Sequence, residues 1–533
     1  MHTKTISGQS GARQDIVHLS ILLAVGLAIG IYLICTAVVI AKDGVTFIEY
    51  ARNLQTAPTE TMIEEAQHPG YPFLILTAHR IVEIVHNGSS LWTWLYSAQG
   101  AALTFRLLGI AAIYGLGRVL VGPGQSFLAT LIFVFLPGPA EYGSDALSDW
   151  PALFFLITGL LLSIRGAAAR KWWLFGLAGV SAGAGYLIRP ECAQLIVYAF
   201  LWLALQLFRP KHIMTRPRLL LALAALLVGF CVLATPYMRL KGAVFPKKGI
   251  GGSVSNVHAG GCQSDPQTTS NAIYAHFAGR SLYVADIASL GVVEGAIKLF
   301  GNIGDTMMWF FVPPMFIGLW DFLKRRAWLE PKQFFVIVPI ILNVALMLWL
   351  HAKYGYMSNR HTLPLVVFCV LYVPLGLQIS ASWLCGRTGP IIRQCGPCRL
   401  GGRTPDSCKN FLFSLLLVMG ICVCIPKLLR PLLHHDKQSL RKTALWLAEN
   451  TGQADVIAVP DFRISFYSGR KAVLFDGVTI PQEARYVVDV LKEGRSVSPQ
   501  GVREAIDKGA LRAEKSIDDD SGNLRIIIYR RVD

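Results

Sequence analysis

Asp43 is the residue best placed for chemistry in this sequence. It follows an apolar stretch, residues 16–41, that is long enough to cross a membrane, and a carboxylate is not needed there for solubility. If a helix begins at this point, Asp43 shares one face of it with Thr46, Phe47 and Tyr50. Such a carboxylate could accept a proton from an incoming hydroxyl group. The alternative is that Asp43 only caps the helix, because aspartate is a favoured N-cap residue.

The composition shows that this carboxylate lies beside a membrane. Of the 533 residues, 53% are hydrophobic and only 16% are charged. Soluble globular proteins have about a quarter of their residues charged. The formal net charge of +17 comes from basic residues scattered among short loops. This scatter favours topology signals and contacts with membrane lipids over a nucleic-acid footprint, so we expect no nucleic-acid partner.

Apolar segments of roughly 20 residues, the length that crosses a bilayer, recur along most of the chain. They predict a polytopic α-helical membrane protein with about eleven transmembrane helices. The predicted spans are 16–41, 92–117, 125–140, 150–164, 172–188, 191–208, 219–237, 304–322, 333–350, 362–384 and 410–426. Residues 70–86 are expected at the interface instead, because His79, Arg80 and Glu83 would each be costly at bilayer depth.

The basic loops predict the orientation of these spans. If residues 70–86 do not cross, the basic loops after the fourth, sixth, eighth and tenth spans all lie in the cytoplasm, and so does the N-terminus. The first outer loop, 42–91, the long outer loop, 238–303, and the C-terminal residues then lie outside the cytoplasm. Polar residues that are costly near a membrane therefore collect on the outer face, which makes that face the candidate functional site.

The chain is expected to form two domains, a membrane domain of residues 1–434 and a soluble domain of residues 435–533. The second has acidic and basic residues in nearly equal number, so the net charge belongs to the membrane part. Residues 439–450 have an amphipathic pattern, and strand-like segments follow, among them 455–459 and 524–529. This alternation predicts a small α/β domain, which the orientation places outside the cytoplasm.

Five short motifs lie on the predicted outer face. In chain order they are Asp43-Gly-Val-Thr-Phe-Ile-Glu-Tyr-Ala51, His68-Pro-Gly-Tyr-Pro72, Ala146-Leu-Ser-Asp149-Trp-Pro151, Leu187-Ile-Arg189-Pro-Glu191 and Asn359-Arg360-His361-Thr-Leu-Pro364. Together they resemble the motifs of GT-C glycosyltransferases, in the branch of protein O-mannosyltransferases, aminoarabinose transferases and related bacterial enzymes that use polyprenyl-phosphate sugars. They extend over most of the membrane domain, and their shared side follows separately from the orientation of the spans.

The resemblance implies a membrane-bound glycosyltransferase of the cell envelope. Such an enzyme would move a sugar, with inversion, from a polyprenyl-phosphate donor to a hydroxyl group on a lipid, glycan or protein acceptor. Asp43 would be the base that deprotonates the acceptor. Asp149 matches the second acid of the family and would orient the substrate or the partners of Asp43. Its alternative role is to cap the span that begins at Pro151.

Cations must stabilise the phosphate that leaves in such a reaction. The candidates on the outer face are Arg189, Lys247, Lys248, Arg280, Arg360 and His361. Arginine suits this role because its planar fork can bind two phosphate oxygens. The two lysines could equally contact lipid headgroups. His68, Tyr71 and Glu191 complete the set of residues that the resemblance places near the substrate, together with Arg189, Lys248, Arg360 and His361.

A divalent metal ion is a possible cofactor. Some relatives have a metal-binding carboxylate just before the proline of the second motif, where this chain has Gln67 and His68. His68 could bind such an ion with His258 and His276, or it could be a structural histidine. A separate group of cysteines, Cys385, Cys395, Cys398 and Cys408, either holds zinc or belongs to an unstructured basic loop in the cytoplasm.

Two other functions fit the membrane architecture. One is transport of a lipid or glycolipid, for which paired inverted repeats and ionisable residues near the midplane are expected. The sequence has no such repeat, and its polar clusters lie at one rim. The other is a ligase or polymerase that joins lipid-linked glycans, which would use a similar architecture.

Overall fold

The structure is a computed structural model. It describes residues 3–86, 88–209, 214–244, 287–324, 330–355, 357–394, 405–429, 435–475, 478–492, 498–518 and 524–532. Lys247, Lys248, His258, His276 and Arg280 lie outside these residues, and so do Cys395 and Cys398.

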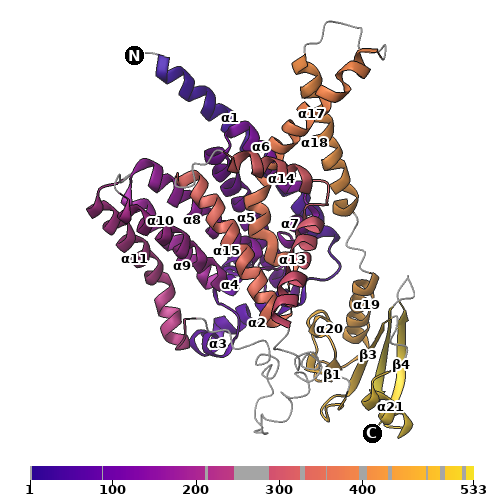
Figure 1. Cartoon of the computed structure of the whole chain (residues 1–533). Helices are drawn as coiled ribbons and strands as arrows, with labels where there is room; N and C mark the ends of the chain where they lie inside the picture. Colours follow the sequence, from indigo (N-terminus) through magenta and orange to yellow (C-terminus); the bar gives the residue numbers. More distant parts are fainter. Residues whose placement is uncertain are drawn as a thin grey trace.

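Helices form most of the chain up to residue 450 (Figure 1). They are α1 (Thr3–Thr36), α2 (Lys42–Thr56), α3 (Pro58–Glu64), α4 (Gly70–His86), α5 (Leu91–Leu120), α6 (Pro123–Phe135), α7 (Pro137–Tyr142), α8 (Asp149–Ala169), α9 (Trp172–Ile188), η1 (Pro190–Ala193), α10 (Gln194–Phe208), α11 (Arg216–Lys241), α13 (Ile287–Thr306), α14 (Val312–Leu323), α15 (Pro331–Tyr354), η2 (Asn359–Thr362), α16 (Leu363–Val370), α17 (Val373–Gln394), α18 (Pro405–Leu429) and α19 (His435–Asn450).

Seven helices among the described residues are long and apolar enough to cross a membrane. The segments 359–370 and 373–386, which are bent by 55° at their junction, make an eighth crossing if they are counted as one span. The three other predicted spans fall on shorter apolar helices of 10–17 residues, which are α6, α9 and α14. The prediction of a polytopic helical membrane protein is therefore confirmed. The number of about eleven crossings stays a prediction. Helix α4, the segment expected at the interface, is not among the candidate spans.

Three predicted boundaries were wrong. The first helix ends at Thr36, so residues 37–41 leave the helix before α2 begins. The long loop 238–303 contains most of helix α13. The span 304–322 is interrupted after α13, because Met308 and Trp309 adopt positive φ angles of 57° and 55°. The Trp309 indole closes this turn by donating a 3.0 Å hydrogen bond to Asp305.

Close helix packing between α9 and α11 depends on small residues. A Cβ atom on Gly183 of α9 would lie 2.9 Å from the backbone oxygen of Phe230 on α11. Helices α9 and α11 therefore approach backbone to backbone, which small residues permit in membrane helices.

The chain ends in a five-stranded sheet with the strand order β2-β1-β3-β5-β4. The elements are β1 (Val456–Val459), α20 (Phe462–Ser468), β2 (Lys471–Leu474), β3 (Tyr486–Lys492), α21 (Gln500–Asp507), β4 (Leu511–Asp518) and β5 (Leu524–Arg531). Strand β1 pairs in parallel with β2 and β3, whereas β3, β5 and β4 pair antiparallel. The predicted small α/β domain is thus present at the C-terminus.

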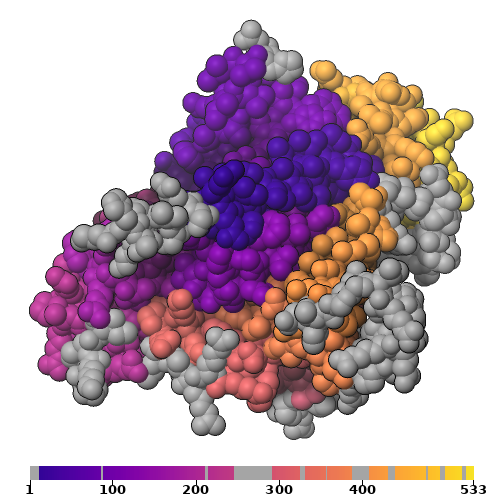
Figure 2. Space-filling view, turned by 90° about the horizontal axis from the view of Figure 1, so that it is seen from above, coloured from indigo at the N-terminus to yellow at the C-terminus, as the bar shows by residue number. Residues whose placement is uncertain are grey.

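The C-terminal sheet domain lies beside the end of the bundle where α2 and α3 are found, and the N-terminus lies at the other end (Figure 1). Seen from that other end, the domain shows only at the edge of the molecule and α1 crosses the middle of the face (Figure 2). The first outer segment of the sequence and the last hundred residues therefore share one end of the molecule.

Candidate functional site

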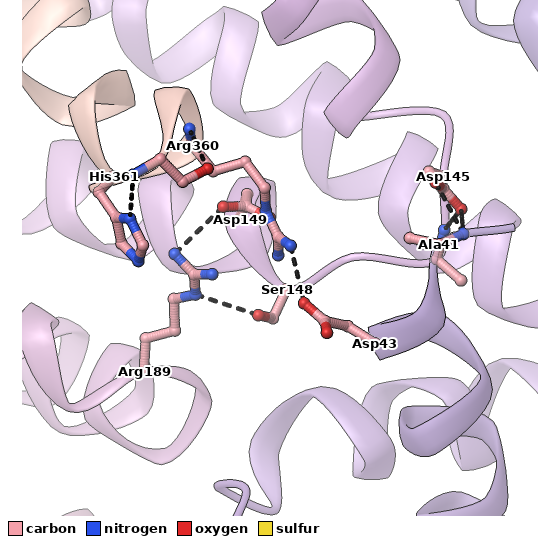
Figure 3. A network of polar contacts seen from close by, with 10 residues as sticks. Ala41, Asp43, Asp145, Ser148, Asp149, Arg189, Arg360 and His361 are labelled. Carbon is pink, nitrogen blue, oxygen red and sulfur yellow. Dashed lines mark hydrogen bonds and ion pairs between the residues drawn. The ribbon is translucent and has the colours of Figure 1, made fainter. Parts of the chain in front are cut away.

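Four segments far apart in the sequence meet at this end of the bundle (Figure 3). They are the first turn of α2, the first turn of α8, the residue that joins α9 to η1, and the short helix η2. Each contributes one charged side chain to a single network, namely Asp43, Asp149, Arg189 and Arg360. The structure thus brings together residues from four of the five motifs.

Arg360 is the centre of this network because its guanidinium group bridges both acids. Its Nε and Nη2 atoms donate to Asp149 Oδ2 at 3.1 and 2.8 Å, and its Nη1 atom donates to Asp43 Oδ2 at 2.7 Å. The Asp149 side chain is 1% exposed, whereas that of Asp43 is 50% exposed. Arg360 is therefore anchored on a buried carboxylate and holds the accessible one with its remaining nitrogen.

Arg189 supports the same buried carboxylate from the other side. Its Nη1 atom lies 3.1 Å from Asp149 Oδ1, and its Nε atom donates to the Ser148 hydroxyl at 3.1 Å. A buried carboxylate requires such partners, since an unpaired charge away from water is very costly. Asp149 consequently fixes the positions of two arginines at once.

Local sequence explains how the two arginines are presented. Arg189 precedes Pro190, which disfavours helical geometry in the residue before it, and Arg189 is extended with φ −146° and ψ 127°. Helix α9 therefore ends at Ile188 and frees the arginine from the helix. In η2, the Ser358 hydroxyl accepts from the Arg360 amide, and the Ser358 amide donates to His361 Nδ1. This reciprocal cap orients Arg360 and His361 together.

A polar cavity of about 250 Å³ opens beside the network. Its lining residues are Asp43, Phe47, Gln67, His68, Ser148, Ile188, Arg189, Pro190, Ser358, Arg360 and His361. A smaller hollow of about 40 Å³ also touches Arg189 and Arg360. Its wall combines apolar residues of α8 and α16 with Cys192 and the polar side chains of Asp149, Glu191 and Gln194. The two arginines therefore line both spaces. Within the described residues, Asp43 Oδ1 has no hydrogen-bond partner, so one carboxylate oxygen of the cavity wall is available.

The other predicted site residues are distributed as follows. His361 and His68 line the cavity, and Glu191 lines the smaller hollow. Tyr71 is fully buried away from both, where its hydroxyl donates to the backbone oxygen of Ala98 at 3.1 Å and its ring packs edge-on against Phe47. Tyr71 therefore braces α4 against α5 and α2, rather than lining the space that a substrate would fill.

His68 is held by aromatic rings. It is buried, with its ring centroid 5.1 Å from that of Tyr186 and 5.2 Å from that of Tyr237. No group of three or more His, Cys, Asp or Glu side chains that could hold a metal ion occurs in the part of the chain that the structure describes. The predicted partners His258 and His276 lie outside it. The described residues alone therefore do not form a metal site around His68, and the divalent metal ion stays a prediction.

Sequence reasoning missed three residues that support the network. Ser148 and Ser358 orient the arginines, as described above. Asp145 accepts hydrogen bonds from the Ala41 amide with both carboxylate oxygens, at 3.1 and 3.0 Å. Ser148 stands next to Asp149 in the third motif and was detectable there. The pairing of Asp145 with Ala41 joins residues 104 positions apart, and no local pattern signals it.

Gly44, the residue after Asp43, lets α2 approach the loop that carries Asp145. A Cβ atom on Gly44 would lie 2.9 Å from the Ala146 Cβ and 3.0 Å from its backbone oxygen. We expect Gly44→Ala to lower the thermal stability of the detergent-solubilised protein, because overpacking costs about 1–3 kcal/mol. The matched control is Gly100→Ala in α5, where a Cβ atom meets nothing within 4 Å. Equal melting temperatures for the two variants would contradict the tight approach.

The fold has known relatives. Residues 101–234 match the model of the family described as dolichyl-phosphate-mannose-protein mannosyltransferase. ArnT from Cupriavidus metallidurans bound to undecaprenyl phosphate is similar over 96% of this chain and 97% of its own, with a TM-score of 0.55 at 12% identity. The chain therefore has a fold similar to that of ArnT, and residues 101–234 resemble the mannosyltransferase family. The fold that the five motifs predict is confirmed.

Two further solved structures are similar to this chain. The apo state of the same ArnT has a TM-score of 0.54, at 12% identity over 96% of this chain and 97% of its own. The archaeal oligosaccharyltransferase AglB from Archaeoglobus fulgidus, in complex with an inhibitory peptide and a dolichol-phosphate, has a TM-score of 0.48 at 13% identity over 89% of this chain and 69% of its own. No curated protein matches the sequence.

Proposed function

We propose that this protein is a membrane glycosyltransferase of the GT-C type that moves a sugar from a polyprenyl-phosphate donor to a hydroxyl acceptor. The observation that carries the proposal is the Arg360 guanidinium, which joins buried Asp149 to accessible Asp43 on the wall of a polar cavity. The relatives support it, since the matched family is named for dolichyl-phosphate-mannose and the ArnT structure contains undecaprenyl phosphate.

Arg189 and Arg360 bind the donor phosphate in this proposal. Both line the polar cavity, and Asp149 fixes both, so their planar forks are oriented before a ligand arrives. The apolar residues of the smaller hollow beside them suit the first part of the polyprenyl chain, while the sugar occupies the polar cavity. A phosphate on this wall competes with Asp43 for Arg360 Nη1, the one nitrogen that Asp149 does not hold.

Release from Arg360 leaves both carboxylate oxygens of Asp43 free to accept a hydrogen bond from the acceptor hydroxyl group. Asp43 then takes the proton of the acceptor hydroxyl group as its oxygen attacks the anomeric carbon. The bond from that carbon to the phosphate oxygen breaks on the opposite face, and its electron pair leaves with the polyprenyl phosphate. The configuration inverts, and the arginines stabilise the charge on the leaving group.

The proposal places the site outside the cytoplasm, with the N-terminus inside. Its support is the agreement of the basic loops under the positive-inside rule. The C-terminal sheet domain lies at the same end of the bundle as α2, whose first turn contains Asp43 (Figure 1). Labelling of the domain therefore also reports the side on which the candidate site lies. Membrane-impermeant labelling of an engineered cysteine near residue 168, with none near residue 480, would reverse this orientation.

Arg360→Lys is expected to weaken donor binding, with a rise in the donor KM of at least about tenfold. A lysine ammonium is a point donor, and it cannot bridge two carboxylates and a phosphate as the guanidinium fork does. Transfer is measured with purified protein and radiolabelled undecaprenyl-phosphate sugars. The matched control is Arg118→Lys. Arg118, in the last turn of α5, also pairs through two guanidinium nitrogens with one acid, Asp15, and lies outside the cavity.

Two outcomes would contradict the proposal. One is wild-type kinetics for Arg360→Lys, which would remove the arginine from donor binding. The other is movement of the intact labelled lipid across the vesicle membrane without any transfer of the sugar, which would favour a transporter.

A further inference from the structure

The C-terminal sheet domain contacts the short segment between α1 and α2, immediately before Asp43. The Ile40 amide donates a hydrogen bond to the Tyr467 hydroxyl of α20 at 3.0 Å. Arg441 of α19 donates to the backbone oxygen of Val38 at 3.0 Å. Two backbone groups of a non-helical segment are therefore bound by side chains that lie some four hundred positions later in the chain.

Side-chain contacts extend this interface on both sides of Asp43. Lys42 Nζ lies 3.2 Å from Asp461 Oδ2 at the start of α20. Although burial alone raises the pKa of Asp461, its hydrogen bonds with Arg463 bring that pKa below the usual range, so the carboxylate stays charged. The Arg52 guanidinium stacks over the Phe466 ring at 5.8 Å. The domain thus contacts α2 as well as the segment before it.

The opposite side of the segment is held by the membrane domain. The Ala41 amide, next to that of Ile40, donates to both carboxylate oxygens of Asp145, in the loop that leads to Asp149. The Ile40 amide is therefore bound by the C-terminal domain, and the next amide, that of Ala41, is bound by the loop that precedes Asp149. A segment outside regular secondary structure has no ladder of its own, so these contacts decide where its backbone lies.

Tyr467 is suited to hold a backbone position. It is buried, and burial raises its pKa to about 12, so its hydroxyl keeps its proton at neutral pH. Its ring also lies 6.2 Å from that of Trp92, at the start of α5. The hydroxyl is consequently fixed by packing against the membrane domain, and its hydrogen bond to Ile40 has the ordinary length of 3.0 Å.

Building on the proposed function, we infer that the C-terminal domain is a positioning part of the active site, in which the Tyr467 hydroxyl fixes the Ile40 amide and thereby the place of Asp43 against Arg360. Asp43 follows Ile40 by three residues and is the first acid of α2. A misplacement of about 1 Å at a reacting group can cost about 100-fold in rate. The domain therefore acts on the rate through the backbone, without touching the reacting atoms.

Tyr467→Phe removes only the hydroxyl group and tests this inference in the full-length protein. Amide hydrogen exchange in residues 37–41 is expected to become about fivefold faster, which corresponds to the loss of one ordinary hydrogen bond. The matched control is Tyr529→Phe, a buried tyrosine of the same domain within the sheet core. The control should leave exchange in residues 37–41 unchanged.

Kinetics separate a positioning role from a general loss of stability. Tyr467→Phe is expected to lower kcat about fivefold or more, because Asp43 is displaced, while the donor KM stays within twofold. The same substitution in an Asp43→Asn background should cause no further loss, since the group it positions is already absent. A purely structural defect would lower the activity of both backgrounds by the same factor.

Two results would overturn the inference. One is unchanged exchange of residues 37–41 in Tyr467→Phe, and the other is an equal loss of kcat with and without Asp43. If the wild-type protein transfers no sugar from any polyprenyl-phosphate donor, the proposed function fails, and the exchange measurement still decides whether the domain holds this segment.

Discussion

Asp43→Asn is expected to lower kcat for sugar transfer by about 10²- to 10⁴-fold, the range that general acid–base catalysis contributes. Asparagine preserves the shape of the side chain and can still accept a hydrogen bond from Arg360, but it cannot take a proton from the acceptor. The loss should therefore fall on kcat, and the donor KM should change little. The measurement is transfer of radiolabel from a polyprenyl-phosphate sugar by purified protein.

The matched control for this change is Asp455→Asn in the C-terminal domain. Asp455 also pairs with one arginine nitrogen, Arg485 Nη1 at 2.9 Å, but it lies outside the cavity. Asp455→Asn should retain the wild-type rate. A wild-type rate for Asp43→Asn would show that Asp43 is not the base, and another group on the cavity wall would then have to take the proton.

Asp149→Asn is expected to destabilise the protein by about 3–5 kcal/mol, because removing one partner of a buried ion pair leaves the other charge uncompensated. Two arginines lose their shared anchor in this variant, so transfer should fall together with stability. Thermal unfolding of the detergent-solubilised protein measures the first effect, and the radiolabel assay measures the second.

A second substitution makes this expectation more specific. Adding Arg189→Gln to Asp149→Asn removes one of the uncompensated charges, so part of the lost thermal stability should return while transfer stays low. The opposite pattern, in which Asp149→Asn melts like the wild type, would mean that Asp149 does not carry the charge balance of the site.

The sequence was sufficient to predict the class of fold and the residues of the polar network. Apolar length indicated the membrane helices, and the charge of the connecting loops assigned Asp43, Asp149, Arg189 and Arg360 to one face. Both signals are local and repeat along the chain. The comparison with ArnT confirms the fold that the motifs suggested. The roles of the four residues in a reaction remain predictions.

Contacts between distant segments could not be predicted in this way. The hydrogen bond from Ile40 to Tyr467 spans 427 positions, and nothing in either local sequence marks the other. Tyr71 shows a related difficulty, because its motif gave no information on which helix face turns inward. The break between α13 and α14 depends on a turn that hydropathy cannot detect, since apolar residues continue through it.

The hydrogen bond from the Ile40 amide to the Tyr467 hydroxyl also implies an order of events during biosynthesis. Chains are made from the N-terminus at about 5–20 residues per second, so the Asp43 segment enters the membrane long before α20 exists. Until the last hundred residues have been synthesised, that segment lacks the partner that fixes its backbone. An unfinished chain therefore lacks this contact, and the backbone before Asp43 reaches its final position only after the C-terminal domain has folded against it.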